Sequence, residues 1–413
     1  MPNYVSKLSV DNVLALVRDT AAQTLCANLR NDLTAETNAR ESADTELGGR
    51  IDAETSARES ADNALEKRIT ETSKIITPEM FGAKGDGTTD DTTAMQNAIN
   101  ESATNGKILL IPAKTYKCTE LIGKDNMHIE GIAGYNSVIL LTTDGFHGLE
   151  SNNYYVESVT IKNIRLKNGG SNLTGFKFLL LRGVIENCYA DRFFTGFHMV
   201  EVTDTNWYQN KVDNGELHGL INCDAIQCDL GFNLKTWDSM YVNLVSSRCN
   251  RGIECGSCSL QGAHIWGFSS NGLIVSSGSR LSNIEVEAAI TNDVTPVGIL
   301  APNVIINGLY LWNINIDKNL IWCNNADYLQ IRGLLVGNAG TLNPEVDATK
   351  ISIIGGTAKS AYIDGSIDES YTSGDGNRIT TPCVVNIWSS HPEVDRTIQA
   401  NWNSRMIPTA WTE

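Results

Sequence analysis

The hydrophobic pattern changes character along the 413-residue chain. Residues 4–10 alternate apolar and polar side chains, as in a short strand, and residues 13–29 follow a helical period. Residues 33–69 carry a thin stripe of Ala, Leu and Ile in an otherwise charged sequence. From Phe81 onward, short apolar runs are separated by Gly and Asn, which predicts strands joined by tight turns. The chain therefore divides into a helical first part and a β-rich remainder.

An internal repeat of 18 residues lies within the helical part: AETNARESADTELGGR at Ala35–Arg50 is followed by AETSARESADNALEKR at Ala53–Arg68. Such a period averages about 3.6 residues per turn, so the apolar stripe should run nearly straight along the helix. Because so polar a helix buries too little surface to be stable by itself, we expect copies of it to associate. Gly48-Gly49 is the expected position of a kink.

A second repeat, a Gly followed by alternating apolar residues, runs through the β-rich part. Its glycines are Gly175, Gly196, Gly231, Gly252, Gly272 and Gly298, and Asn319 takes the next position. The spacings are 21, 35, 21, 20, 26 and 21 residues, and about 21 residues make one coil of a β-helix. We expect each Gly to supply the tight turn before its strand. Asn187, Asn222 and Asn243 each lie nine residues before a repeat Gly, which predicts a ladder of Asn side chains.

The segment that joins the two parts reads FGAKGDGTTDDT from Phe81 to Thr92. It closely resembles the opening signature of the pectate-lyase-like family of right-handed parallel β-helices. The resemblance implies an all-β fold, a single-stranded right-handed parallel β-helix with an N-terminal capping helix. The 18-residue repeat predicts an α-helical coiled-coil stalk before it. Residues 92–103 have the pattern of that capping helix, with Asp91 or Thr92 as N-cap. A solenoid end exposes unpaired backbone and apolar side chains, so a cap is also expected on physical grounds.

The helical part resembles proteins of phage tails. Residues 4–23 are loosely similar to N-terminal segments that attach such proteins to a larger particle, and repeats like the one at 35–68 occur in trimeric tail fibres. The resemblance implies a homotrimer, with a dimer or a solvated single helix as alternatives. It also implies a phage tail or baseplate protein as partner of the N-terminus, and a place in the virion tail after assembly in the host cytoplasm. The N-terminus lacks the layout of a secretion signal.

These patterns divide the chain into five expected segments. They are a particle-attachment segment at 1–29, a coiled-coil stalk at 30–75, the β-helix entry and cap at 76–150, the rungs at 151–340, and C-terminal strands with a cap at 341–413. Further strands are expected at 350–354 and 361–367.

Charge and composition remove several classes of function. A net charge of −16 argues against a nucleic acid partner, because binding to phosphates needs clustered Lys and Arg. The chain lacks the run of about 20 apolar residues that membrane insertion needs. Of the ten cysteines, Cys255 and Cys258 form a single CxxC pair, whereas a zinc knuckle usually takes two. Cys188, Cys223 and Cys255 are therefore interpreted as small apolar residues inside a reduced solenoid, with zinc or disulfides as the alternative. No cofactor and no metal is predicted.

The spacing of 35 residues leaves a surplus of roughly 14 over one coil, at Val202–Gly215. Loops that leave a regular scaffold often bind ligands, and aromatic faces beside amides and carboxylates suit a sugar. An ordinary surface excursion or a contact between subunits is the alternative. Candidate glycan-binding residues here are Trp207, Tyr208, Gln209, Asn210 and Lys211, and candidate catalytic carboxylates are Asp204, Asp213 and Glu216.

A second group of candidates lies on two successive rungs. All four side chains are expected to point outward. His264 and Trp266 are candidates for glycan contact, and Glu285 and Glu287 are candidates for a catalytic pair. Residues two apart on one strand are about 6–7 Å apart at Cα, which is compatible with the carboxyl spacings of glycoside hydrolases. Plain solvation of an outer β face is the alternative.

Other enzyme signatures are incomplete. His218-Gly219 and Asn222-Cys223-Asp224 resemble fragments of polygalacturonase motifs, but the rungs lack the adjacent Asp pair. The function predicted from these observations is a phage tail fibre or tailspike that recognises a bacterial surface polysaccharide during host adsorption, with depolymerase activity left open. The alternatives are a polysaccharide-degrading enzyme, either a glycoside hydrolase or a lyase, and a purely structural virion protein.

Overall fold

The computed structural model forms two compact units, Met1–Ser73 and Lys74–Glu413. It describes residues 5–72, 74–200, 219–235, 239–276, 278–289, 294–312, 321–326, 328–337, 354–358, 361–367 and 384–389.

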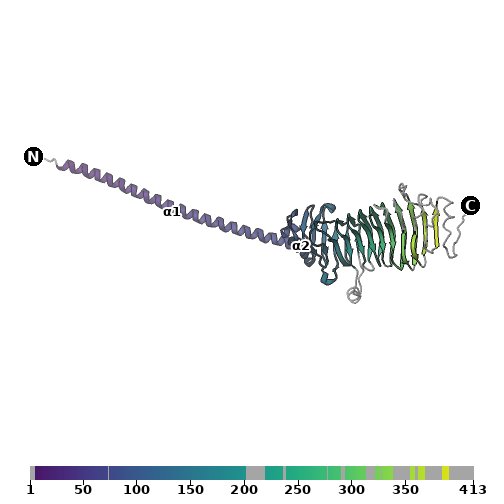
Figure 1. The fold of residues 1–413 in the computed structure, drawn as a ribbon. Helices are drawn as coiled ribbons and strands as arrows, with labels where there is room; N and C mark the ends of the chain where they lie inside the picture. The colour runs from purple at the N-terminus through teal and green to yellow at the C-terminus, as the bar shows by residue number, and fades with distance from the viewer. Residues whose placement is uncertain are drawn as a thin grey trace, which may run out of the picture. The chain divides into compact units, whose positions relative to one another are not determined.

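The first unit is one helix, α1 (Val5–Thr72), of 68 residues (Figure 1). The strand predicted at 4–10 is wrong for Val5–Val10, because these residues are helical. An alternation of six residues is too short to outweigh the helical pattern of the residues that follow. The helix continues through Gly48 and Gly49 without interruption. None of the described helices is long and apolar enough to cross a membrane.

The apolar side chains of α1 are exposed in the single chain. They are Leu25, Leu29, Leu33, Leu47, Ile51, Leu65 and Ile69, with exposed fractions between 52% and 67%. Leu33, Ile51 and Ile69 are the residues that recur with the 18-residue repeat. The described part of the helix therefore presents a stripe of exposed apolar side chains on its surface.

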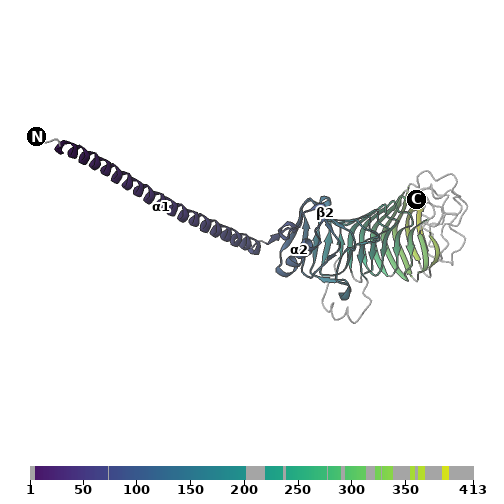
Figure 2. The same ribbon diagram turned by 60° about the vertical axis from the view of Figure 1, so that its left-hand side comes forward.

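The second unit begins with the predicted cap. Helix α2 (Thr92–Asn105) lies at the N-terminal end of the stacked strands (Figures 1 and 2) and buries Met95, Ala98 and Ile99 completely. These residues belong to the main hydrophobic core of the solenoid. The capping helix predicted at 92–103 is confirmed.

Asp91 holds the signature loop against the start of α2. It occupies the N-cap position, but its carboxylate makes no cap hydrogen bond to the helix. One carboxylate oxygen accepts the backbone N–H of Lys84 at 2.7 Å and the other that of Gly85 at 2.9 Å, and Asp91 is 2% exposed. Gly85 has a φ of +64° there, which other residues rarely adopt. The signature therefore builds the entry turn.

All strand pairings are parallel, and one sheet carries the repeat glycines. Its order is β28-β26-β24-β22-β20-β18-β15-β12-β8-β5, with β9 (Tyr155–Glu157) paired to β12. The strands are β5 (Leu121–Ile122), β8 (Phe146–His147), β12 (Thr174–Leu181), β15 (Thr195–Met199), β18 (Leu230–Leu234), β20 (Arg251–Cys255), β22 (Asn271–Val275), β24 (Thr295–Ile299), β26 (Ile321–Ala326) and β28 (Ile354–Ala358).

The other sheet starts as two ladders that merge at β19 (Met240–Ser247). The first ladder is β1 (Ile75–Ile76), β3 (Ile108–Ile111), β6 (His128–Gly131), β10 (Thr160–Lys162), β13 (Val184–Glu186) and β16 (Leu220–Ile221). The second is β2 (Asp86–Asp90), β4 (Thr115–Cys118), β7 (Val138–Leu141), β11 (Arg165–Asn168), β14 (Tyr189–Asp191) and β17 (Asp224–Ile226). Beyond the merger come β21 (Ser259–Trp266), β23 (Ser279–Glu287), β25 (Asn303–Trp312), β27 (Tyr328–Gly337), β29 (Ala361–Ile367) and β30 (Val384–Ser389). Short 3₁₀ turns lie at Pro78–Phe81, Gly134–Asn136 and Glu150–Asn152.

The repeat glycines are required by close approach between coils and not, as predicted, by turn conformation. Gly175, Gly196, Gly231, Gly252 and Gly272 all lack a positive φ. A Cβ on each would lie 2.3–2.7 Å from a backbone oxygen of the next coil, too close for any side chain. Small residues here let successive coils stack tightly.

The repeat position predicted at Gly298 is out of register. Gly298 pairs with Ile274, so the counterpart of Gly272 is Pro296. A constant spacing in the sequence does not predict this position correctly, because the connections between coils vary in length. Asn319, the next predicted repeat position, lies outside the described residues.

The predicted Asn ladder is confirmed. Asn187, Asn222 and Asn243 have φ near +50° at the bend between the two ladders, and the Asn243 amide donates to the Asn222 side-chain oxygen at 3.1 Å. After the merger the same bend is made by Gly262, Asn283 and further glycines at positive φ.

The interior of the solenoid is apolar and aligned between coils. Phe176, Phe197 and Phe232 stack with ring centroids 4.8 and 4.9 Å apart and nearly parallel planes. Cys188 and Cys223 are fully buried free thiols within the same core, as predicted, and each thiol lies within hydrogen-bonding distance of a backbone carbonyl of the preceding coil. Burial raises the pKa of the Cys188 thiol to about 12, so it is inert at neutral pH.

Candidate functional site

The structure brings together the candidates on β21 and β23. His264 pairs in register with Glu285, and Trp266 with Glu287. Between them Ile265 is fully buried, so the four polar and aromatic side chains share the outer face, as the alternation predicted. The remaining candidates lie outside the described residues: Asp204, Trp207, Tyr208, Gln209, Asn210, Lys211, Asp213 and Glu216.

The carboxylates converge on the imidazole. His264 Nε2 lies 3.1 Å from Glu287 Oε2. One ligand atom from each of His264, Glu285 and Glu287 lies within 4.8 Å of the others. That spacing is compatible with a divalent cation, but the hydrogen bond already satisfies the imidazole without one. One oxygen of Glu285 and one of Glu287 thus lie within 4.8 Å of each other, which is nearer to the carboxyl spacing of retaining glycoside hydrolases, about 5–5.5 Å, than to that of inverting enzymes.

Two aromatic residues that the sequence analysis missed complete this face. Tyr310 and Trp312 on β25 pair with Glu285 and Glu287, and their ring centroids are 5.2 Å apart. Burial, together with the negative charges of Glu285 and Glu287, raises the pKa of the Tyr310 hydroxyl. The alternation Leu309-Tyr310-Leu311-Trp312 was the available signal, since both leucines are fully buried.

We call these residues the carboxylate–aromatic face. It comprises His264, Trp266, Glu285, Glu287, Tyr310 and Trp312. The Arg248 guanidinium lies 5.2 Å from the Trp266 ring centroid, at the edge of the face. A cavity of about 360 Å³ opens beside it, lined by Glu285, Tyr310 and Leu335 together with the bend residues Asn283, Gly308 and Gly333.

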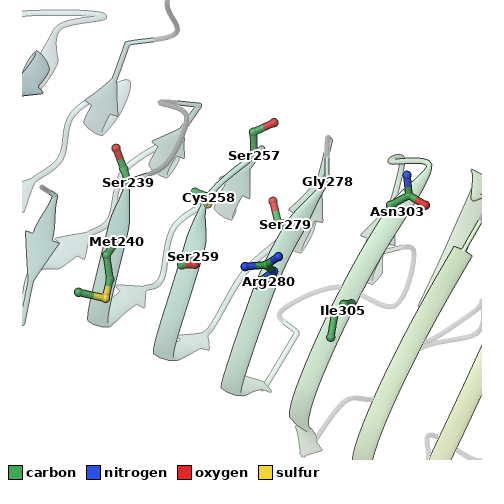
Figure 3. Close-up of a pocket in the computed structure, with 10 residues that line it drawn as sticks. All are labelled: Ser239, Met240, Ser257, Cys258, Ser259, Gly278, Ser279, Arg280, Asn303 and Ile305. Carbon is green, nitrogen blue, oxygen red and sulfur yellow. The ribbon is translucent and has the colours of Figure 1, made fainter. Parts of the chain in front are cut away.

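A second cavity, of about 560 Å³, lies over the first halves of the same strands. Figure 3 shows Met240, Ser259, Arg280 and Ile305 on four neighbouring strands, with serines and Asn303 at the strand starts. Hydroxyls, an amide and a guanidinium beside apolar side chains are suited to a sugar bearing an acidic group. The sheet therefore carries two hollows on β23 and β25, one basic and one acidic.

Asp224 is a third carboxyl group on the same ladder of the sheet. It pairs with Val245, which pairs with His264, so it lies two coils before the imidazole. Burial raises the pKa of Asp224 to about 6. In the sequence, Asp224 stands out only as part of the motif fragment Asn222-Cys223-Asp224, because neither its burial nor its neighbours can be predicted from spacing.

The raised pKa of Asp224 predicts a dependence of stability on pH. Its neutral form is favoured in the folded state, so the protein is most stable below about pH 4 with respect to this group and loses that stability as the pH rises through about 6. We expect Asp224→Asn to raise the free energy of unfolding at pH 7 by about 1 kcal/mol, a value reduced for partial exposure, and to change nothing at pH 4. Thermal unfolding at both pH values measures this.

Asp229→Asn is the matched control. Burial raises the pKa of Asp229, but hydrogen bonds from Asn250 and Arg251 outweigh it and lower that pKa overall. The control substitution should therefore reduce stability at pH 7. Equal effects of the two substitutions on stability at pH 7 would contradict the raised pKa of Asp224.

Residues 79–257 match the family model for rhamnogalacturonase A/epimerase, pectate lyase-like. The match covers less than half of the chain, and the stacked parallel strands confirm the β-solenoid fold that the resemblance predicted.

Similar proteins include capsule depolymerases of Klebsiella phages. The K30/K69-specific depolymerase of phage K64-1 is 52% identical over 56 residues, 14% of this chain and 7% of that protein. The K30/K69-specific depolymerase 1 of phage K5-2 is 58% identical over 91 residues, 22% of this chain and 10% of that protein. The aligned segments thus span a tenth or less of these relatives' lengths. The enzymatically active domain of tailspike protein 2 of bacteriophage CBA120 is 14% identical over 70% of this chain and 47% of that chain, with a TM-score of 0.48.

Proposed function

We propose that this protein is a phage tailspike that binds a bacterial capsule polysaccharide on the carboxylate–aromatic face and cleaves it there. The observation that supports this most directly is the convergence of Glu285, Glu287 and His264 beside the half-buried rings of Tyr310 and Trp312. Aromatic faces stack on the C–H faces of sugars, and paired carboxylates perform glycoside hydrolysis. The similarity to capsule depolymerases of Klebsiella phages supports the same substrate class.

The proposed reaction is hydrolysis with retention of configuration. Glu285 donates a proton to the glycosidic oxygen while a Glu287 oxygen attacks the anomeric carbon, which releases the leaving sugar and leaves a glycosyl-enzyme ester. Glu285, now ionised, takes a proton from water, and the water oxygen displaces Glu287. His264 bonds to one oxygen of Glu287 and so orients that carboxylate as the nucleophile.

The test is incubation of the purified chain with capsule polysaccharides. Types K30, K69 and KN3 are the first choices, because the similar depolymerases are specific for them. We expect new reducing ends and shorter chains from at least one capsule of this class. Unsaturated ends would instead indicate a lyase and overturn the hydrolytic mechanism. Binding without cleavage would leave a receptor-binding protein, and neither binding nor cleavage across a capsule panel would favour a structural role.

We further propose that α1 is a trimeric coiled-coil stalk, with residues 1–29 attached to the phage tail. The support is the 18-residue repeat and the exposed apolar stripe, which three parallel copies would cover. Sedimentation of the intact chain should give three times the 45.0 kDa chain mass. Ile51→Asp, in the middle of the stripe, should shift the protein toward monomer, whereas the same change at a polar stalk position, Ser56→Asp, should not. A wild-type monomer would refute the stalk.

A further inference from the structure

Three metal-ligating side chains meet at the first coils of the solenoid, away from the carboxylate–aromatic face. His147 is the last residue of β8, and Asp144 lies two residues before that strand. Glu120 lies immediately before β5, the neighbour of β8 in the sheet. One ligand atom from each of the three lies within 4.8 Å of the others. The register of β5 and β8 thus brings together residues from two successive coils.

His147 is buried, and one of its ring nitrogens has no hydrogen bond within the part of the chain that the structure describes. The residue is 8% exposed. Its Nδ1 lies 2.7 Å from the Gly148 carbonyl oxygen, which can only accept, so Nδ1 carries the proton. Nε2 has no hydrogen-bond partner among the described residues and lies 3.6 Å from an Asp144 oxygen and 4.0 Å from a Glu120 oxygen. In the neutral ring its lone pair therefore faces two carboxylates, an arrangement that a cation between them would stabilise.

The distances favour a bound cation over a protonated imidazole. An N–H of His147 donating to Asp144 would require a separation of about 3 Å, and both observed separations are longer. A zinc ion with bonds of about 2.0–2.2 Å holds neighbouring ligand atoms about 3.4 Å apart, close to the observed spacing. A metal-bound histidine also commonly donates its other ring N–H to a backbone carbonyl, as His147 does to Gly148.

We propose that His147, Asp144 and Glu120 bind a divalent transition metal ion, with Zn²⁺ as the preferred occupant. One imidazole nitrogen with two carboxylates suits Zn²⁺, whereas Ca²⁺ and Mg²⁺ take oxygen ligands. The side chains of Glu120 and Asp144 are 51% and 55% exposed, which leaves a solvent side for a water ligand. Lys177, which pairs with His147 in the register of β8 and β12, has its ammonium held against the Tyr154 ring, 3.7 Å from the ring centroid. The ion would join the coils of β5 and β8 and stabilise the capped end of the solenoid.

Zinc titration of the untagged, chelator-treated full chain tests this site. We expect calorimetry to show one binding event per chain, and the melting temperature to rise by about 3 °C at a hundredfold excess of Zn²⁺ over the dissociation constant. His147→Gln should weaken that binding by about 100-fold and abolish the rise in melting temperature. The double variant Glu120→Gln/Asp144→Asn should weaken binding and abolish the rise in melting temperature in the same way. Because it changes only half-exposed side chains, it tests the site even if His147→Gln fails to fold.

Two control variants identify the site. His128→Gln removes another imidazole near a carboxylate, with His128 Nε2 at 3.9 Å from Glu130, where no third ligand is present among the groups the structure describes. His264→Gln removes the imidazole of the carboxylate–aromatic face. Both controls should keep the wild-type affinity and melting shift. The proposal is overturned if His147→Gln binds Zn²⁺ like the wild type, or if only His264→Gln loses the binding.

Discussion

Glu287→Gln is expected to reduce cleavage of a susceptible capsule polysaccharide by about 10³-fold, with the fold and the oligomeric state unchanged. The amide keeps the shape of the side chain and its contact with His264 but cannot attack the anomeric carbon. Glu285→Gln should cause a comparable loss, because it removes the proton donor. The double variant should be little worse than either single one, since both residues act in one step. Release of reducing ends measures all three rates.

Binding and cleavage should separate in these variants. Polysaccharide affinity is expected to stay within a few-fold of wild type, because Trp266, Tyr310 and Trp312 remain in place. Glu150→Gln is the matched control, an exposed carboxylate at one of the 3₁₀ turns, and should cleave like wild type. If the Glu285 and Glu287 variants retain full activity, the catalytic site lies elsewhere, although the face would still be open to test as a binding surface through Trp312→Ala.

Gly252→Ala is expected to destabilise the solenoid by about 3 kcal/mol or more. Its new Cβ would lie 2.3 Å from the Gly272 carbonyl oxygen and 2.4 Å from Ile265 Cγ2, and the backbone oxygen is fixed by the ladder of the next coil. One methyl group would therefore push two coils apart. Chemical unfolding followed by tryptophan fluorescence measures the loss.

A Gly→Ala substitution in α1 should instead increase stability. A Cβ on Gly49 meets nothing within 4 Å, and alanine is favoured over glycine inside a helix by about 1 kcal/mol. Gly49→Ala should raise the melting temperature of the helical signal at 222 nm. Two Gly→Ala changes of opposite effect would separate close packing between coils from backbone entropy, and a tolerated Gly252→Ala would show that the coils are less tightly stacked than described.

The fold was predictable from the sequence where local pattern and coil geometry coincide. Asn187, Asn222 and Asn243 lie at a constant distance from their repeat glycines because each bend and the following strand have a fixed length. The helical spacing of Met95, Ala98 and Ile99 predicts the capping helix. Prediction failed at Gly298 because connections of variable length break the constant spacing, and only the hydrogen-bonded register identifies Pro296 as the residue below Gly272.

The candidate site was predictable in part. His264 and Trp266, and likewise Glu285 and Glu287, are pairs within one strand, so alternation alone assigns them to the outer face. Tyr310 joins them only through the register of β23 and β25, which no local pattern reports.

The sequence by itself determined that a polar helix with an 18-residue repeat precedes a capped solenoid of Gly-marked coils, because periodicity and turn chemistry are local properties. Only the tertiary structure decided which residues of different coils meet. Stacking brings residues about one coil apart in sequence to neighbouring strands, and the exact length of each connection decides which side chains face one another. The meeting of Glu285 with Tyr310, and of Glu120 with His147, depends on that register and on nothing that either segment carries alone.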